Sequence, residues 1–319
     1  MYVCSDCRGP LTENVRCQTC GWTALQRDGW IDYLRTLDRA DSSIGAYIET
    51  YDTLAKRNQS VPVESNVYVE NLSARFAEVI GDISGKDVCD VGSGRGYLIK
   101  HFLSRNPRSV TAIDIAAPSL VDVVQRYGVT GIMANAEHLP FQEHFDVIAA
   151  TDIIEHVLNV SNFLVTANWS LRTGGKLAAR VPYLENFLYY SNYHGLPVHY
   201  THIRTFDRRT LVELVKSFGF RIDRVVYDGF NPNYPSSFLD ALPSLKKPIV
   251  DALRKRYGGD DNVTKISPAL GKILMKPIEI GVVATKVEHI KPVDAHRSFR
   301  EFHEQTKRAK EQPSEAAVG

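Results

Sequence analysis

One glycine-rich turn constrains this chain more than any other stretch of its sequence. Residues 88–96 (VCDVGSGRG) begin as an apolar strand and end in three glycines, and a helix is expected to start near Tyr97. Glycines permit a tight turn and let a ligand approach the backbone, while the first turn of a helix offers unpaired N–H groups. The pattern therefore predicts a ligand-binding loop at the carboxyl edge of an open α/β sheet.

The residues around this loop narrow the choice of ligand. The glycine spacing is G-x-G-x-G, so Tyr97 stands where the dinucleotide fingerprint has its third glycine. Asp90, at the end of the strand, would repel a pyrophosphate but suits a ligand that carries an amino group and a sulfonium. Asp114 ends a second apolar run about twenty residues later, where an acidic residue can accept hydrogen bonds from ribose hydroxyls. Together these residues predict a site for S-adenosylmethionine (SAM).

Further segments carry a family resemblance. Residues 134–141 (ANAEHLPF), 152–156 (DIIEH) and 171–177 (LRTGGKL) look like the adenine loop, the segment after the fourth strand and the entry to the fifth strand of class I SAM-dependent methyltransferases, in that order. The resemblance covers residues 68–230 and is to the small-molecule type related to ubiquinone-biosynthesis O-methyltransferases. It implies a Rossmann-like, seven-stranded, mostly parallel sheet. The implied cofactor contacts are Asp90, Gly92, Gly94, Gly96, Asp114, Ile115, Ala136, Glu137, Thr151 and Asp152.

Near-continuous apolar runs, typical of parallel strands buried on both faces, predict the central strands. These runs are 87–91, 109–114, 129–134, 145–150 and 175–181, and two more strands are expected at 221–228 and 278–287. Cys89 is expected to fill the core. Before the first of these strands, residues 67–80 predict an amphipathic helix.

An aromatic- and histidine-rich stretch, residues 184–204, follows the fifth expected strand, where methyltransferases of this type build their acceptor pocket. The resemblance there implies substrate contacts from Tyr193, His199 and Arg204, although Arg204 has a local carboxylate partner as its alternative. His156 and His202 are the candidate catalytic bases, because an imidazole pKa near ~6.5 suits proton removal at neutral pH. A structural role is the alternative for each histidine. A metal site at His199 and His202 is not favoured, because the sequence offers no evident third ligand.

Four of the five cysteines lie near the N-terminus, as two C-x-x-C pairs: Cys4, Cys7, Cys17 and Cys20. Two such pairs can hold a structural Zn²⁺ tetrahedrally, and a segment with so little core needs such a link to fold. Disulfides or loose thiols are the alternative, disfavoured because no secretory signal is visible. The segment resembles zinc-ribbon modules at the front of some methyltransferases, which also occur as the separate activator subunit of others.

The composition and the length of the chain limit its class and its domain organisation. Hydrophobic residues make up 44% of the 319, charged residues make up 24%, and the net charge is +1, so we expect an ordinary globular protein without a general affinity for nucleic acid. No run approaches the ~20 apolar residues of a membrane span, and a cytoplasmic protein is expected. The expected division is a zinc ribbon at 1–34, a helical linker with cofactor-covering helices at 35–85, a methyltransferase domain at 86–290 with an insertion at 229–277, and a flexible tail at 291–319. The insertion holds a basic amphipathic stretch, for which a solvated helix is preferred over a lid, a dimer contact or a membrane-surface patch.

The favoured function is SAM-dependent methyl transfer to a small-molecule acceptor, above all a hydroxyl of a sugar, lipid or secondary metabolite. The alternative is an rRNA or tRNA base methyltransferase that uses the ribbon for RNA contact. Residues 1–40 hold five acidic and five basic side chains, which is not the basic patch that phosphate contacts require. A non-catalytic scaffold is disfavoured by the intact glycine loop, and a homodimer is left open.

Overall fold

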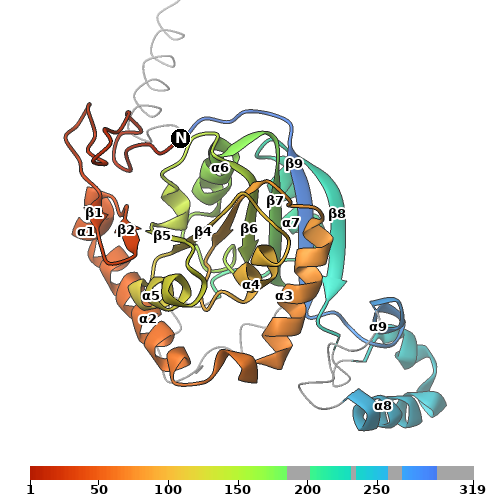
Figure 1. Cartoon of the computed structure of the whole chain (residues 1–319). Helices are drawn as coiled ribbons and strands as arrows, with labels where there is room; N and C mark the ends of the chain where they lie inside the picture. The colour runs from red at the N-terminus through yellow and green to blue at the C-terminus, as the bar shows by residue number, and fades with distance from the viewer. Residues whose placement is uncertain (185–201, 231–234, 258–267, 293–319) are drawn as a thin grey trace, which may run out of the picture.

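The computed structural model describes residues 1–184, 202–230, 235–257 and 268–292 (Figure 1). Two of the predicted substrate residues, Tyr193 and His199, lie outside the described residues. So does nearly all of the predicted tail.

The described residues form one mixed sheet with the strand order β1-β2-β5-β4-β3-β6-β7-β9-β8 (Figure 1). Strands β2 to β7 run parallel to their neighbours, whereas β9 is antiparallel to both β7 and β8, and β1 is antiparallel to β2. The strands are β1 Leu25–Gln26, β2 Trp30–Asp32, β3 Asp87–Val91, β4 Ser109–Asp114, β5 Thr130–Met133, β6 Phe145–Thr151, β7 Leu171–Pro182, β8 Phe220–Asp228 and β9 Glu279–Lys286.

The predicted Rossmann-like, mostly parallel sheet is confirmed, but the predicted count of seven strands is wrong. The seven expected strands are all present, and a hairpin from the N-terminal segment adds two more. Gly29, with φ +82°, makes the turn of this hairpin, and β2 then pairs in parallel with β5. Trp30 lies opposite Gly131, where a Cβ would come within 2.9 Å of the Trp30 Cβ, so a glycine on β5 permits this close approach.

The helices of the described residues are α1 Thr36–Ala40, α2 Ser42–Gln59, α3 Val67–Ile80, α4 Tyr97–Leu103, α5 Ala117–Tyr127, α6 Val160–Ser170, α7 Arg208–Lys216, α8 Pro243–Tyr257 and α9 Pro268–Leu274. Helices α3, α4 and α5 pack on one face of the sheet and α6 and α7 on the other, while further helices lie outside these two layers. The predicted helix at 67–80 is confirmed as α3. Asp41 caps α2 by accepting a 2.7 Å hydrogen bond from the Ser43 N–H, and Asp207 forms a capping box with Thr210 at the start of α7.

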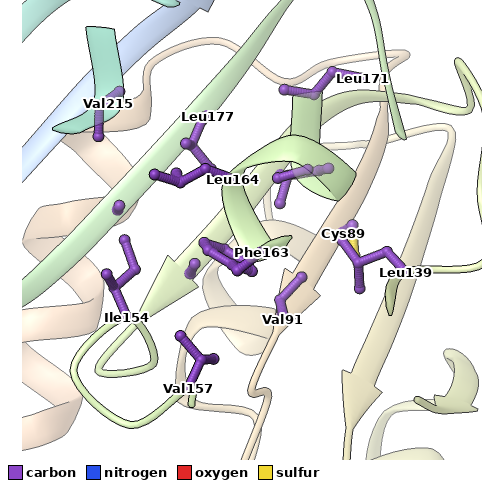
Figure 2. Packing of buried hydrophobic residues seen from close by; sticks show 14 of the residues in the cluster. Cys89, Val91, Leu139, Ile154, Val157, Phe163, Leu164, Leu171, Leu177 and Val215 are labelled. Carbon is purple, nitrogen blue, oxygen red and sulfur yellow. The ribbon is translucent and has the colours of Figure 1, made fainter. Parts of the chain in front are cut away.

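Alternating strand residues divide the apolar core into two layers. On one face Val88, Ala112, Val147 and Ala149 pack with side chains of α3, α4 and α5. On the other face Cys89, Val91 and Leu177 pack with α6 and α7, and Figure 2 shows Phe163 and Leu164 of α6 lying against them. Cys89 is 0% exposed, as expected of a core residue.

The segment between β8 and β9 forms a separate helical lobe. It contains η6 (Ser237–Ala241), α8 and α9, which lie beyond the end of β8 in Figure 1. Phe230, Leu253 and Met275 form its small core. Among the described residues, no helix combines the length and the apolar character needed to cross a bilayer.

Candidate functional site

A cavity of about 510 Å³ opens at the carboxyl ends of the central strands, beneath α2. Tyr47, Tyr51, Leu54 and Ala55, on one face of α2, form its cover. A second hollow of about 560 Å³ adjoins it around the glycine loop and shares Gly92, Gly94 and Asp152 with it. Parallel α/β sheets bind their ligands at this edge.

The glycine loop is fixed by sterics and by Asp114. Gly92 has φ +71°, and a Cβ there would lie 2.1 Å from Cγ1 of Ile153, so a side chain at this position is excluded. Asp114 accepts hydrogen bonds from the Gly94 N–H (2.8 Å) and the Ala116 N–H (2.9 Å). The hydrogen bond to the Gly94 N–H thereby connects the end of β4 to the glycine loop. Gly96 is the N-cap residue of α4 and lies against Tyr127 of α5, and it lines neither cavity.

Asp90 is a buried carboxylate at the end of β3. It is 2% exposed, and its Oδ1 has no hydrogen-bond partner among the described residues. Burial, and then the nearby Asp114 charge, raise the pKa of Asp90 to about 8, although Arg180 opposes the shift. A cationic group in the hollow would stabilise the ionised carboxylate. The site therefore fits a ligand with a positively charged amino group.

Arg180 is a site residue that the sequence reasoning missed. It lies on β7, is 3% exposed, and forms ion pairs with Asp152 and Glu279. Burial lowers the pKa of Arg180, but the carboxylates of Asp152 and Glu279 outweigh this and raise it. The signal was available, because an arginine interrupts the apolar run of a strand that is otherwise buried on both faces.

The loop after β5 forms another wall of the main cavity. Asn135, Ala136 and Glu137 line it together with Ile115. The Asn135 side chain accepts a 3.0 Å hydrogen bond from the Glu137 N–H, and Glu137 Oε1 accepts a 2.7 Å bond from the Leu158 N–H. The side chains of the loop thus hold its own backbone and the segment after β6.

The structure brings His156 and His202 together at the cavity. Both line it, and their ring centroids lie 4.5 Å apart at an interplanar angle of 86°. Arg204 does not line the cavity. Its guanidinium donates to the backbone carbonyls of residues in the segment after β6, including Leu158 at 2.8 Å. Among the described residues, Arg204 therefore holds this segment in place through hydrogen bonds to its backbone carbonyls.

The sulfur atoms of Cys4, Cys7, Cys17 and Cys20 all lie within 4.8 Å of one another. Burial raises the pKa of Cys17, but the N–H groups of Cys20 and Thr19 directed at its sulfur, together with neighbouring thiols, lower it overall to about 6. Four thiols in this arrangement, with N–H groups supporting a thiolate, fit a tetrahedral Zn²⁺ site.

Residues 65–225 match the family model described as a methyltransferase domain. The chain belongs to the methyltransferase domain family. The enzyme class predicted from the sequence, a SAM-dependent methyltransferase, is confirmed at the level of this family, and every predicted cofactor contact except Gly96 lines one of the two cavities of the methyltransferase domain.

Relatives with known names match parts of the methyltransferase domain. The ubiquinone biosynthesis O-methyltransferase of Rickettsia bellii is 32% identical over 110 residues, which are 33% of this chain and 43% of that protein. The tRNA U34 carboxymethyltransferase of Campylobacter curvus is 28% identical over 110 residues, 33% of this chain and 37% of the relative. The chain thus spans less than half the length of these relatives.

Two solved structures share the fold. A chain from a complex that contains the Haloferax volcanii Trm112 methyltransferase activator has a TM-score of 0.54 at 12% identity, and the match covers 77% of this chain and 100% of that one. The Burkholderia thailandensis 1,6-didemethyltoxoflavin-N1-methyltransferase, with bound S-adenosylhomocysteine, has a TM-score of 0.50 at 16% identity. The match covers 77% of this chain and 90% of that one.

Proposed function

We propose that this protein transfers the methyl group of SAM to a hydroxyl of a small molecule, with sugars, lipids and secondary metabolites as the favoured acceptors. The buried carboxylate of Asp90 carries the proposal, because a buried acid whose Oδ1 has no hydrogen-bond partner among the described residues favours a cationic amino-acid tail over a phosphate. The ubiquinone biosynthesis O-methyltransferase among the relatives supports a hydroxyl acceptor.

Each part of the cofactor has a chemical match in the site. Asp114 would hold the ribose hydroxyls, Asp90 the amino group, and the backbone at Ala136 and Glu137 the adenine. When bound, SAM supplies a methyl group whose bond to sulfur breaks, with the electron pair left on sulfur, as its bond to the acceptor oxygen forms. The chain mainly has to align the reactants, which is worth up to ~7–11 kcal/mol of the barrier.

His156 and His202 would receive the proton that the acceptor hydroxyl loses. Both imidazoles line the cavity, and Tyr51 of α2 packs edge-on against His156 with ring centroids 5.9 Å apart. General-base assistance of this kind contributes about 10²–10⁴-fold to a rate. Arg204 would act as a positioning residue, because its carbonyl contacts hold the segment that carries His156.

RNA base methylation is the second candidate, and the tRNA U34 carboxymethyltransferase among the relatives favours it. The charge balance of the first 40 residues, five acidic against five basic, argues against phosphate contacts by the ribbon. We therefore rank it below the small-molecule acceptor.

The four N-terminal thiols would hold one structural Zn²⁺, and this fits a protein kept in a reducing compartment such as the cytoplasm. We retain the sequence-based division into ribbon, helical cover, methyltransferase domain and tail as a proposal.

Radiolabelled SAM and a cell extract test the proposed function. The purified protein should label small molecules in the extract, and ribonuclease treatment should leave the label in place. Asp114→Ala should lose the label, whereas Glu213→Ala, at a mostly exposed position on α7, should keep it. Label that disappears with ribonuclease would support the RNA alternative and refute the hydroxyl acceptor.

A further inference from the structure

A third hollow lies beside the two cofactor cavities and shares Glu279 with the main cavity and Arg180 with the glycine-loop hollow. Its volume is about 300 Å³, at the lower end of the ~300–1,000 Å³ of small-molecule sites. Residues of α3 form one wall, residues of β7, β9 and β8 form another, and α9 contributes Lys272. Since α9 belongs to the segment between β8 and β9, this insertion helps to enclose the hollow.

The register of the strands gives this hollow an apolar surface. Arg180 of β7 and Val226 of β8 each lie opposite Gly281 of β9, so a glycine separates two side chains across the sheet. A Cβ at Gly281 would come within 2.7 Å of Cε2 of Phe76 and 3.2 Å of Cγ2 of Val226, so a side chain is excluded there. Phe76 packs over the strand backbone instead. Together with Val79 of α3, Phe76 and Val226 offer apolar contact to a ligand.

Two arginines of the hollow have acidic partners within the protein. Arg75 donates hydrogen bonds of 2.8 and 2.6 Å to Asp228, and Arg180 forms ion pairs with Asp152 and Glu279. Arg180 is 3% exposed, yet its Nη1 has no hydrogen-bond partner among the described residues. Because buried donors are nearly always paired, this nitrogen favours an acceptor atom from a ligand.

Two further cations line the hollow without an acidic partner. Across the part of the chain that the structure describes, the side chains of Arg224 on β8 and Lys272 on α9 form no ion pair and no hydrogen bond. The Lys272 Nζ lies 5.8 Å from the centroid of the Tyr227 ring, which is also part of the wall. Among the described residues of the wall, Glu78 is the one acid outside the pairs above. Two cations therefore stand against one acid, and the hollow attracts an anion.

We propose that this hollow is a second binding site, for a small organic acid with an apolar body. The carboxylate would bind Arg224 and Lys272, since a guanidinium can hold a carboxylate through two parallel hydrogen bonds and an ammonium adds a second positive charge. The apolar body would lie against Phe76 and Val226, between α3 and the sheet. None of these four residues is a predicted contact of SAM, so the site does not depend on the proposed methyl transfer.

A pair of matched probes tests the site without reference to catalysis. The anionic probe is 2-naphthoate, which joins a carboxylate to a flat apolar body, and 2-naphthylmethanol offers the same rings without the charge. Arg180 also lines the hollow around the glycine loop, so S-adenosylhomocysteine is first added to saturation to block that region. A ligand-observed NMR titration of the full chain should show naphthoate binding about tenfold more tightly than the alcohol, the scale of one hydrogen bond between charged groups.

Substitution of the two cations should remove the preference for the anionic probe. Arg224→Ala and Lys272→Ala should each weaken naphthoate binding, and the double variant should bind naphthoate no more tightly than the alcohol. Both side chains are exposed, so neither substitution removes a buried contact. Arg221→Ala is the matched control, at an exposed arginine of the same strand whose Nη2 lies 3.3 Å from Asp223. Arg221 does not line the hollow, so its loss should leave naphthoate binding unchanged.

Three results would overturn the inference: no naphthoate binding by the wild-type protein, equal affinities for naphthoate and the alcohol, or an unchanged preference for naphthoate in the double variant. None of them bears on the proposed methyl transfer. A protein that fails to bind S-adenosylhomocysteine would instead refute the proposed function, and the same titration of the cofactor-free protein would still decide whether the hollow binds naphthoate.

Discussion

Loosening the N-terminal ribbon should weaken cofactor binding, although among the described residues none of the first 34 lines either cavity. The ribbon contacts both ends of the loop that follows β5 and lines the main cavity. Before the loop, the Tyr33 N–H donates a 2.8 Å hydrogen bond to the Met133 carbonyl. After the loop, the Val3 N–H donates a 3.0 Å bond to the Pro140 carbonyl, and Arg8 donates to the next carbonyl upstream.

The substitution Tyr2→Ala tests this attachment of the ribbon to the loop most directly. The Tyr2 ring contacts Tyr33, Phe141 and His144, with centroid distances of 5.7, 4.9 and 5.1 Å. Aromatic pairs contribute about 0.5–1.5 kcal/mol each beyond the area that they bury, so the two pairs with Tyr33 and Phe141 together stabilise the ribbon's attachment to the loop by about 1–3 kcal/mol. A loop released by the substitution must be ordered again when the cofactor binds, at ~1–2 kcal/mol per residue.

Since ~1.4 kcal/mol corresponds to a tenfold change in affinity, S-adenosylhomocysteine should bind Tyr2→Ala about tenfold more weakly. Calorimetry measures the affinity, and amide hydrogen exchange at residues 134–138 should speed up in the variant. Glu13→Ala, at an exposed position in the ribbon, is the control and should change neither. A folded Tyr2→Ala protein with wild-type affinity would refute the coupling.

Three further outcomes are expected. Asp114→Ala should weaken S-adenosylhomocysteine binding by ~1.5–3 kcal/mol, the scale of hydrogen bonds to a charged group, and unchanged affinity by calorimetry would exclude Asp114 as the ribose ligand. The raised pKa of Asp90 leaves its carboxyl protonated below about pH 8, so binding of the cationic amino group should release a proton, and the affinity should fall as the pH drops from 8 to 6. Calorimetry in buffers of different ionisation enthalpy measures this proton release, which Asp90→Asn should abolish. Elemental analysis should find about one Zn²⁺ per chain in the four-cysteine site, and a folded, reduced, metal-free protein would contradict this.

The central strands could be predicted because their signal is local. Each is a short run of apolar residues that must be buried on both faces, and β3 and β4 begin and end where the runs do. The glycine loop and the two acidic residues beside it could be predicted equally well, because their spacing along the chain indicates directly that they lie at the ends of neighbouring strands.

The two extra strands could not be recognised in the same way. Residues 25–32 contain an Asp-Gly turn typical of a hairpin, but nothing in their sequence specifies the strand with which β2 pairs. Its partner depends on Gly131, about a hundred residues away, which allows the backbone of Trp30 to approach. The contact between His156 and His202 could not be predicted for the same reason, because the hydrogen bond from the Ile203 N–H to the Glu155 carbonyl joins two segments that are distant in the sequence.

The pairing of β2 with β5 also determines what can dock on this side of the molecule. An uncovered edge strand offers a row of free N–H and C=O groups on which another polypeptide can add a strand. Here the protein's own N-terminal hairpin occupies that row, and the hairpin's outer strand β1 is only two residues long. A protein that is to pair with β5 would first have to displace β2, so the chain carries in its own sequence the strand that covers this edge of the parallel sheet.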